Sequence, residues 1–310
     1  MPSLRIGYLS TMYHTSHILK ACRWVETLGV TAEWNLFGTG PAMVKAFTAG
    51  ELDIGYIGLP PAMIGIGKGL PLTCIGGGHA EGTVMIGPDS ATACDETHPL
   101  NDVLQQFTGK TIAAPTAGSI HDVIARYFIK HHQVAGASMR NYPWADLMPA
   151  AIDDNEISAA FGTPPLAVVA RKWHGHRIVI PAAKIWPFNP SYGIVVHTSL
   201  LPETALLEGF LTQHERACNL IINQTDEAAA IVAKAVAVVD PDFVREVFAV
   251  SPRYCAALPR EYIDATMAFI PVLKDMQYLK RNLTEDEVFD FSIIDKVHPE
   301  PHHYFDKLAG

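Results

Sequence analysis

A short pattern occurs twice in this chain, and the repeat limits its fold more than any other feature. The stretch GELDIGYIGLPP covers residues 50–61, and NEISAAFGTPP covers residues 155–165. In each copy a helix end precedes an apolar strand, and two prolines follow. Proline is well tolerated in the first turn of a helix, where its missing N–H would have no partner. The repeat therefore predicts two consecutive lobes of about one hundred residues that share one βαβαβ plan.

The repeated helix starts also indicate where a ligand would bind. In open α/β sheets, ligands lie at the carboxyl ends of the strands, and a helix that begins there directs unpaired N–H groups toward them. Such junctions are predicted at Gly58–Pro61 and Gly162–Pro165. We therefore expect a binding cleft formed by loops of this kind from both lobes.

The segments around the repeat extend this plan. Helices are expected to begin near Ser16, Pro41 and Ser119, where capping residues or proline precede apolar positions at helical spacing. Residues 89–101 are polar and irregular, which is typical of a linker, and residues 201–310 are mostly helical with prolines at the breaks. Apolar strands are expected at 4–10, 30–38, 72–78, 82–88, 176–182 and 191–197.

Composition excludes several classes of protein. The chain has 310 residues, of which 49% are hydrophobic, and this is enough for a large core and two domains. With 23 basic and 32 acidic residues the net charge is −9, which argues against nucleic acid or an anionic membrane surface as partner. No apolar run approaches the roughly 20 residues of a membrane span. The five cysteines are scattered without a Cys-x-x-Cys pair, so neither a disulfide framework nor a zinc knuckle is expected.

Three segments resemble a known family. They are GPAMVKAFTAGELDIGYIGLPPAMI (40–64), GKTIAAPTAGSIHD (109–122) and AAIDDNEISAAFGTPP (150–165). Together with a strand near Tyr192 that returns to the first sheet and a helical tail, they are similar to the type II periplasmic substrate-binding proteins. The nearest likeness is to the sulfonate, taurine, nitrate and thiamine-pyrimidine branch.

This resemblance implies an α/β, two-lobed periplasmic binding protein type II fold with a helical C-terminal tail. Lobe 1 would comprise residues 1–87 and 189–310, and lobe 2 residues 88–188, joined by crossings near Ile86–Asp89 and Pro181–Pro190. Such a protein is a monomer without a cofactor, which closes over a small organic solute and delivers it to the permease of an ABC importer. Closure needs only a few flexible residues between rigid lobes, and both crossings are rich in glycine, proline and polar residues.

The candidate ligand-binding residues are those at strand ends that face the expected cleft. None of these loops contains lysine or arginine, which disfavours a clamped inorganic anion, whereas their aromatic residues fit a flat ring. The solute is therefore expected to combine an anionic or polar group with a flat ring or apolar part. The candidates are Ser10, Thr11, Tyr13, His14, Thr39, Gly58, Leu59, His79, Glu81, Thr116, Ser119, His121, Gly162, Thr163, Trp186 and Tyr192.

Several candidate residues also have a purely structural interpretation. Ser119 and Asp122 have the spacing of a helix cap, and Tyr56 lies inside a strand where core packing is common. Trp186 lies in an expected crossing, and both ligand contact and packing are open for it.

Histidines raise the alternative of a metal site. His14, His79 and His121 all fall in expected cleft loops, with Glu81 nearby, and these are metal-ligand types. No two of these three histidines have the His-x-x-x-His spacing that places two ligands on one helix face. Hydrogen bonding from neutral imidazole to an organic ligand is therefore the preferred interpretation, and no metal is expected. The pairs at 131–132 and 302–303 are expected to be solvated residues at a helix end and in the tail.

An enzyme on the same fold is the alternative function. The chain begins with Met a few residues before its first strand. A protein whose leader had been replaced would be periplasmic or on the cell surface, whereas one that starts natively at Met1 would be cytoplasmic. A cytoplasmic protein would resemble chorismate dehydratase or the yeast-type pyrimidine synthase, with His14, His79, Glu81 or His121 as general acid or base. The clustered cysteines of that synthase have no counterpart here, so a binding protein is preferred.

Overall fold

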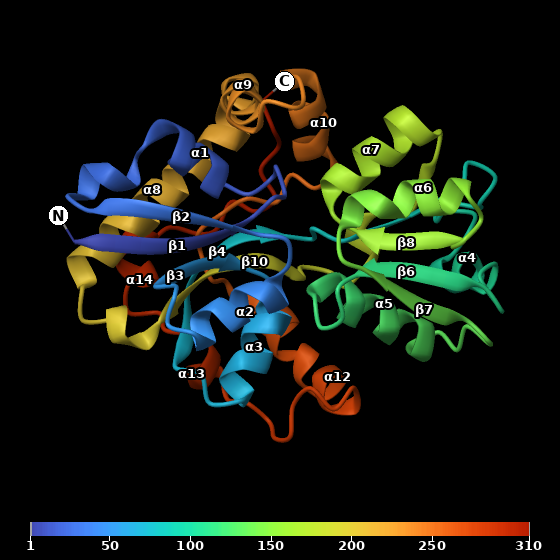
Figure 1. The fold of residues 1–310 in the computed structure, drawn as a ribbon, viewed down its shortest axis with the longest axis horizontal. Helices are drawn as coiled ribbons and strands as arrows, with labels where there is room; N and C mark the ends of the chain where they lie inside the picture. The colour runs from blue at the N-terminus through green and yellow to red at the C-terminus, as the bar shows by residue number, and fades with distance from the viewer. Residues whose placement is uncertain (1, 310) are drawn as a thin grey trace.

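The computed structural model describes residues 2–309, which form two α/β lobes side by side (Figure 1). Each lobe contains one five-stranded sheet, with strand order β2-β1-β3-β10-β4 in the first and β7-β6-β8-β5-β9 in the second. The strands of the first sheet are β1 (Ser3–Leu9), β2 (Thr31–Phe37), β3 (Ile54–Ile57), β4 (Leu72–Ala80) and β10 (Pro190–His197). Those of the second are β5 (Val84–Gly87), β6 (Thr111–Pro115), β7 (Ser138–Tyr142), β8 (Ala159–Gly162) and β9 (Arg177–Ile180).

The two sheets share one topology, which confirms the predicted repeat. β1 pairs in parallel with β2 and β3, and β6 does the same with β7 and β8. In each sheet the fourth strand is antiparallel to its neighbours, and it comes from a distant part of the chain: β10 in the first sheet and β5 in the second. The predicted return of the segment around Tyr192 to the first sheet is thus confirmed.

The exchange of these strands corrects the predicted boundary between the lobes. β5 was expected in the first lobe, which was to end at residue 87, but it pairs with β8 and β9 of the second sheet. The first crossing therefore lies at Glu81–Thr83, and the second at 181–189, between β9 and β10. All residues of β5 are buried, and an apolar run of this kind does not reveal which sheet it joins.

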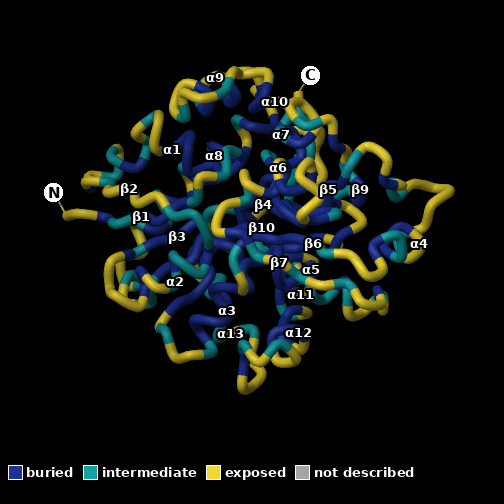
Figure 2. Tube along the Cα trace, turned by 45° about the vertical axis from the view of Figure 1, so that its right-hand side comes forward, coloured by how far each residue is buried: buried dark blue, intermediate teal, exposed yellow. Residues whose placement is uncertain are grey.

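The helices of the two lobes cover the faces of their sheets. The first lobe has α1 (Ser16–Cys22), α2 (Gly40–Thr48) and α3 (Leu59–Gly67), and the second has α4 (Leu100–Gln105), α5 (Ile120–His131), α6 (Met148–Asp153) and α7 (Pro164–His174). Because both faces of each sheet are covered, β3, β4, β8 and β10 are buried along almost their whole length (Figure 2).

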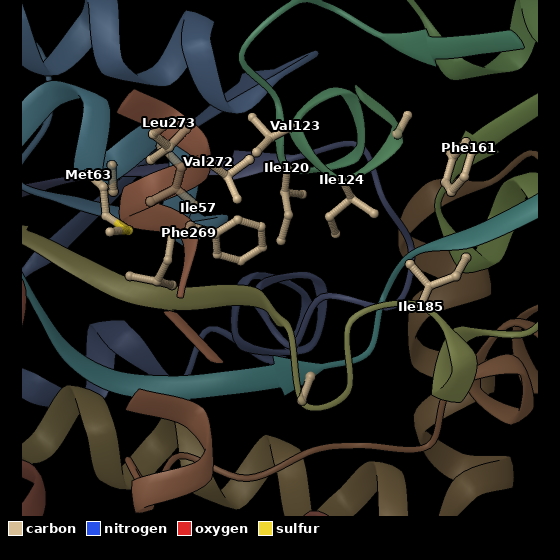
Figure 3. Packing of buried hydrophobic residues seen from close by; sticks show 14 of the residues in the cluster. Ile57, Met63, Ile120, Val123, Ile124, Phe161, Ile185, Phe269, Val272 and Leu273 are labelled. Atoms are coloured by element: carbon tan, nitrogen blue, oxygen red, sulfur yellow. The ribbon is translucent and has the colours of Figure 1, made fainter. Parts of the chain in front are cut away.

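The tail after β10 is helical, as predicted, and touches the second lobe on both flanks. On one flank α10 packs against α7, where Trp173 stacks on Phe243 at 5.4 Å between ring centroids. On the other, Figure 3 shows apolar residues of α12 beside Ile120 of α5. The tail helices are α8 (Thr204–Asn223), α9 (Thr225–Val236), α10 (Pro241–Val250), α11 (Arg260–Met267), α12 (Phe269–Asp275), α13 (Glu285–Val288) and α14 (Ile294–Val297). None of the helices within residues 2–309 has the length and apolarity that a membrane crossing requires.

The two crossings contact each other and contain unusual backbone. Glu81, Trp186 and Phe188 all have positive φ, at 58°, 45° and 59°, a conformation that costs a residue other than glycine roughly 1–3 kcal/mol. Glu81 donates its N–H to the carbonyl of Asn189 at 2.8 Å, and its carboxylate accepts the N–H of Phe188 at 3.1 Å. These bonds hold the strained segments together at the junction of the lobes.

Candidate functional site

A cleft of about 610 Å³ lies between the two lobes and is lined by residues from both. From the first lobe come the loop after β1, the start of α2 and the start of α3. From the second come the starts of α5 and α7 and the loop after β7. The tail contributes Val236, Val238, Val239 and Phe243.

Four helices begin at this cleft, two from each lobe. Their N-cap residues are Thr39 of α2, Gly58 of α3, Ser119 of α5 and Thr163 of α7, and all four line the cavity. The positive ends of four helix dipoles therefore point toward one region. This arrangement favours a ligand with a negative or electron-rich polar group.

The four helix starts differ in how many N–H donors they offer. In α3 and α7 two consecutive prolines occupy the first turn, so each helix lacks two of the N–H groups that would otherwise be unpaired. In α5 the only capped donor of the first turn is the N–H of Asp122, which bonds to Ser119 Oγ at 3.3 Å. The N–H groups of Ile120 and His121 have no acceptor within the helix. α5 is therefore the strongest donor among the four.

Polar side chains at the base of the cleft come from both lobes. Tyr13 and Ser191 bond through their hydroxyls at 2.8 Å, and His121 Nδ1 bonds to Thr83 Oγ1 at 2.9 Å. Burial lowers the pKa of His121 to about 4, so the imidazole is neutral at pH 7. Its Nε2 is therefore available to exchange a hydrogen bond with a solute.

At the mouth of the cleft, Trp144 of the second lobe reaches the first. A β-carbon placed on Gly38 would lie 2.7 Å from the indole ring, so the glycine allows the ring to rest on the backbone. Asp146 is the one charged residue that lines the cleft within residues 2–309, and neither lysine nor arginine does so. The cavity therefore has flat apolar surfaces and a few hydrogen-bonding groups, without a cationic clamp.

Half of the predicted site residues line this cleft. They are Ser10, Thr11, Tyr13, Thr39, Gly58, Ser119, His121 and Thr163. The others lie outside its lining: His14, Leu59, His79, Glu81, Thr116, Gly162, Trp186 and Tyr192.

Three of the misplaced residues form a buried layer around Tyr13. The His14 and Tyr192 rings lie 4.0 Å apart between centroids, and His79 stacks parallel to Tyr192. Burial lowers the pKa of His79 to about 3, and its Nε2 bonds to the Ser251 carbonyl at 2.6 Å. These side chains support Tyr13 rather than line the cavity.

Trp186 and Glu81 face away from the cleft. The Trp186 ring stacks on Phe269 at 4.0 Å between centroids, and its Nε1 donates to the Ala265 carbonyl at 3.1 Å. Glu81 pairs with Arg253 at 3.3 Å. Both residues line a separate groove of about 1160 Å³ beside the crossings. The sequence located the second crossing but did not indicate which of its sides faces the cleft.

Two residues of the cleft lining were missed although the sequence contained a signal for each. Ser191 precedes Tyr192 in a strand, where neighbouring side chains point to opposite faces. Trp144 follows β7, which is the repeat counterpart of β2, and the loop after β2 was among the predicted cleft loops. Applying the repeat to this loop as well would have identified Trp144.

The structure does not assemble the metal site considered at the cleft. His79 bonds to Ser251, His121 to Thr83, and Glu81 to Arg253 and Phe188. Within the described part of the chain, His14, His79, His121 and Glu81 do not form a set of mutually close ligand atoms. Asp122 is a structural residue, as its capping pattern indicated, since it is fully buried and ion-paired with Arg126 at 2.8 Å.

Comparison with known proteins identifies the fold and a family. The family model described as the NMT1-like family matches residues 1–237. No curated protein matches the chain.

Three solved structures illustrate the likeness in fold. The ligand-binding component of an ABC-type import system from Staphylococcus aureus, solved with zinc bound, has a TM-score of 0.79 at 15% identity, covering 97% of this chain and 100% of its own. The alkanesulfonate-binding protein SsuA from Xanthomonas axonopodis pv. citri, bound to MOPS, gives 0.77 at 16%, with 93% and 98% coverage. The periplasmic nitrate-binding protein NrtA from Synechocystis PCC 6803 gives 0.76 at 14%, with 96% and 88% coverage.

Proposed function

Since the chain belongs to the NMT1-like family, we propose that it is a solute-binding protein, which closes its two lobes over a small organic molecule and delivers it to an ABC importer. The observation that carries this proposal is the cleft itself. It lies between two lobes joined by only two crossings, and helix starts from both lobes meet in it. A ligand held by both lobes stabilises the closed form, which a membrane partner can recognise.

The cleft chemistry supports a particular class of solute. The aromatic side chains of Tyr13 and Trp144 both line the cleft and suit a solute with a flat ring. A carboxylate or other electron-rich group fits at the start of α5, where Ile120 and His121 offer N–H donors. A bare inorganic anion fits less well, because tight clamping of such ions usually uses arginine.

The remaining parts of the proposal follow from this role. Structures of similar fold are described as periplasmic binding proteins for sulfonates and nitrate, and an importer takes its solute from outside the cytoplasmic membrane. We place this protein on that side, as a monomer that meets the permease in its closed form.

The enzyme alternative has less support from the geometry. Of the four residues considered as general acid or base, only His121 lines the cleft. His14 and His79 lie in the buried layer around Tyr13, and Glu81 is paired with Arg253 beside the crossings. A general acid and base must both reach the substrate.

Native mass spectrometry of the purified protein, followed by denaturation and identification of the released molecule, tests the proposal. We expect one intact solute, and titration of the stripped protein with it should change tryptophan fluorescence. His121→Ala should weaken binding at least about tenfold, because it removes a buried hydrogen-bonding group of the site. His131→Ala, at the exposed end of the same helix, is the matched control and should leave the affinity unchanged.

Two results would contradict this assignment. A released molecule that is converted to a new mass on incubation with fresh protein would indicate an enzyme. Equal affinities of the His121→Ala and His131→Ala proteins would show that the solute does not occupy this cleft.

A further inference from the structure

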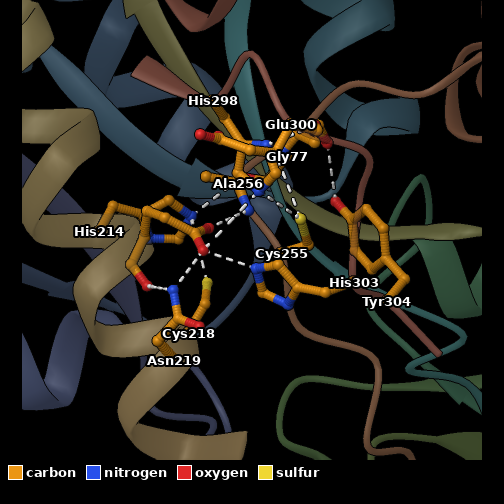
Figure 4. Close-up of polar contacts among 12 residues, drawn as sticks. Gly77, His214, Cys218, Asn219, Cys255, Ala256, His298, Glu300, His303 and Tyr304 are labelled. Atoms are coloured by element: carbon orange, nitrogen blue, oxygen red, sulfur yellow. Dashed lines mark hydrogen bonds and ion pairs between the residues drawn. The ribbon is translucent and has the colours of Figure 1, made fainter. Parts of the chain in front are cut away.

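Four metal-ligand side chains meet on the first lobe, outside the lining of the cleft. Glu215 lies in α8, Cys255 in the segment between α10 and α11, and His298 and His303 in the C-terminal tail. Figure 4 shows Cys255, His298 and His303 close together, and one ligand atom from each of the four residues lies within 4.8 Å of all the others. Of the two tail histidines, His303 had been expected in solvent and His298 had not been assigned a role, but the fold brings both beside Cys255.

The distances within this cluster suit a common centre. Cys255 Sγ lies 3.4 Å from His298 Nε2, and His303 Nε2 lies 2.5 Å from Glu215 Oε1. His298 Nε2 is 3.8 Å from the same carboxylate oxygen. In a tetrahedral zinc site, with bonds of about 2.0–2.3 Å, neighbouring ligand atoms lie between roughly 3 and 4 Å apart. Small side-chain rotations are enough to convert the observed contacts into such a site.

Backbone groups orient three of the four side chains. His298 Nδ1 lies 3.0 Å from the Glu300 carbonyl, which fixes its proton on Nδ1 and leaves the Nε2 lone pair facing the cluster. Glu215 Oε2 accepts the N–H of Ala256 at 2.9 Å, whereas Oε1, which also accepts from Asn219 Nδ2 at 2.5 Å, faces His303 and His298. Cys255 Sγ accepts the N–H of Ala257 at 3.4 Å. Outer hydrogen bonds of this kind are typical of metal ligands.

The cluster is also enclosed. Cys255 is fully buried, and the side chains of His298, Glu215 and His303 are only 6%, 15% and 17% exposed. His303 Nδ1 is buried without a hydrogen-bond partner among residues 2–309. Four protein ligands complete a tetrahedral shell and leave no position for a substrate, which distinguishes a structural from a catalytic metal site.

We propose that Glu215, Cys255, His298 and His303 bind one Zn²⁺ ion, which fixes the C-terminal tail to the first lobe. One thiolate, two imidazoles and one carboxylate are the ligand types that zinc prefers, whereas calcium and magnesium require oxygen. The ion joins α8, the segment beside β4 and the tail. No covalent or redox step is involved.

The tail that this ion holds extends to the junction of the lobes. Tyr304, next to His303, is fully buried and donates its hydroxyl to the Ala257 carbonyl at 3.1 Å. Its ring lies 5.1 Å from that of Phe188 in the second crossing, and Phe305 also packs on Phe188. Loss of the ion should therefore loosen packing on one side of the second crossing as well as the tail.

Metal analysis of the purified full chain is the first test. After dialysis against metal-free buffer we expect about one zinc per chain. Removal with a strong chelator should lower the unfolding temperature, and added Zn²⁺ should restore it. Co²⁺ added to the stripped protein should give the strong visible absorption of a tetrahedral ion, together with a thiolate-to-metal charge-transfer band.

Single substitutions of the proposed ligands test where the ion binds. Cys255→Ser and His303→Gln should each reduce retained zinc at least tenfold, and Cys255→Ser should also remove the charge-transfer band. Cys94→Ser removes a thiol elsewhere and should change neither. A second histidine cluster, formed by Asp153, His174 and His176, has only three ligands and a carboxylate that is 45% exposed. His174→Ala is therefore the control for adventitious binding, and zinc should be retained.

Two results would overturn the proposal. Less than about a tenth of an equivalent of zinc, with no charge-transfer band after Co²⁺ addition to the folded wild-type chain, would show that the cluster is only a hydrogen-bonded network. Zinc lost in His174→Ala but retained in Cys255→Ser would place the ion at the other cluster. Circular dichroism of each variant ensures that these readings come from folded protein, and the wild-type measurement remains decisive if a variant does not fold.

Discussion

A single glycine at the cleft mouth sets how closely the two lobes approach. The Trp144 ring packs directly against the backbone of Gly38 and leaves no room for a β-carbon there. The contact joins the end of β2 in one lobe to the loop after β7 in the other. At the residue scale, closure therefore depends on the absence of a side chain at this position.

Substituting this glycine should impair closure without unfolding either lobe. We expect Gly38→Val to weaken solute binding at least about tenfold, since the larger side chain pushes the indole ring outward and holds the lobes apart. The double variant Gly38→Val/Trp144→Ala relieves this clash, so the two substitutions should be non-additive in a double-mutant cycle of binding free energies. Strictly additive effects would indicate that the ring does not press on residue 38 in the bound form.

At the scale of elements, the start of α5 is the best-supported helix terminus of the cleft. Buried Asp122 accepts the N–H of Gly118 at 2.9 Å, Arg126 Nε at 2.8 Å and Asn141 Nδ2 at 2.8 Å. One carboxylate thus joins the loop before α5, the helix itself and the end of β7. It holds the helix start at which the proposed solute group would bind.

Asp122→Ala should lower the free energy of unfolding by roughly 2–4 kcal/mol, because it leaves these donors without a partner in a buried place. The matched control is Asp275→Ala in α12, which removes an exposed ion pair with Lys130 and should cost less than about 1 kcal/mol. Both values come from denaturant unfolding. Similar losses for the two variants would mean that Asp122 does not have this organising role.

The elements also show what the sequence could predict. Strands, paired prolines and the cap at Ser119 depend on local chemistry, and these predictions were correct. Three features depend on contacts between distant segments. They are the sheet that β5 joins, the packing of Trp186 away from the cleft, and the contact between Glu215 and His303. Local periodicity carries no information about such contacts. For this reason only half of the predicted site residues line the cleft, and the cluster of Glu215, Cys255, His298 and His303 was not predicted.

At the scale of the whole molecule, buried histidines make stability depend on pH. Burial lowers the pKa of His17, His121 and His214 to about 4 and that of His79 to about 3, and it also lowers that of His14. The unfolded chain binds protons at these residues near pH 6.5, but the folded chain does not. Their neutral forms therefore favour the folded state fully above pH 6.5, and this stability is lost as the pH falls toward 4.

We expect the free energy of unfolding of chelator-treated protein to fall steeply between pH 6.5 and 5, by about 2 kcal/mol at pH 5 for each histidine with a pKa near 4. The pKa values of His298 and His303 are raised to about 9 and 10. Their protonated forms therefore stabilise the folded chain, and this contribution is lost as the pH rises above 6.5, outside this window. Urea unfolding at several pH values measures this dependence. A flat profile across the window would show that the buried histidines become protonated within the fold.

The exchange of β5 and β10 has a consequence for how the chain is made. β10 lies between β3 and β4 in the first sheet, but a ribosome produces it more than one hundred residues after β4 and only once the second lobe is complete. Until then the emerging first sheet has a central gap with unpaired strand edges on both sides. The amino-terminal lobe therefore finishes folding last, and a truncated chain that ends before residue 190 should aggregate rather than form a stable half.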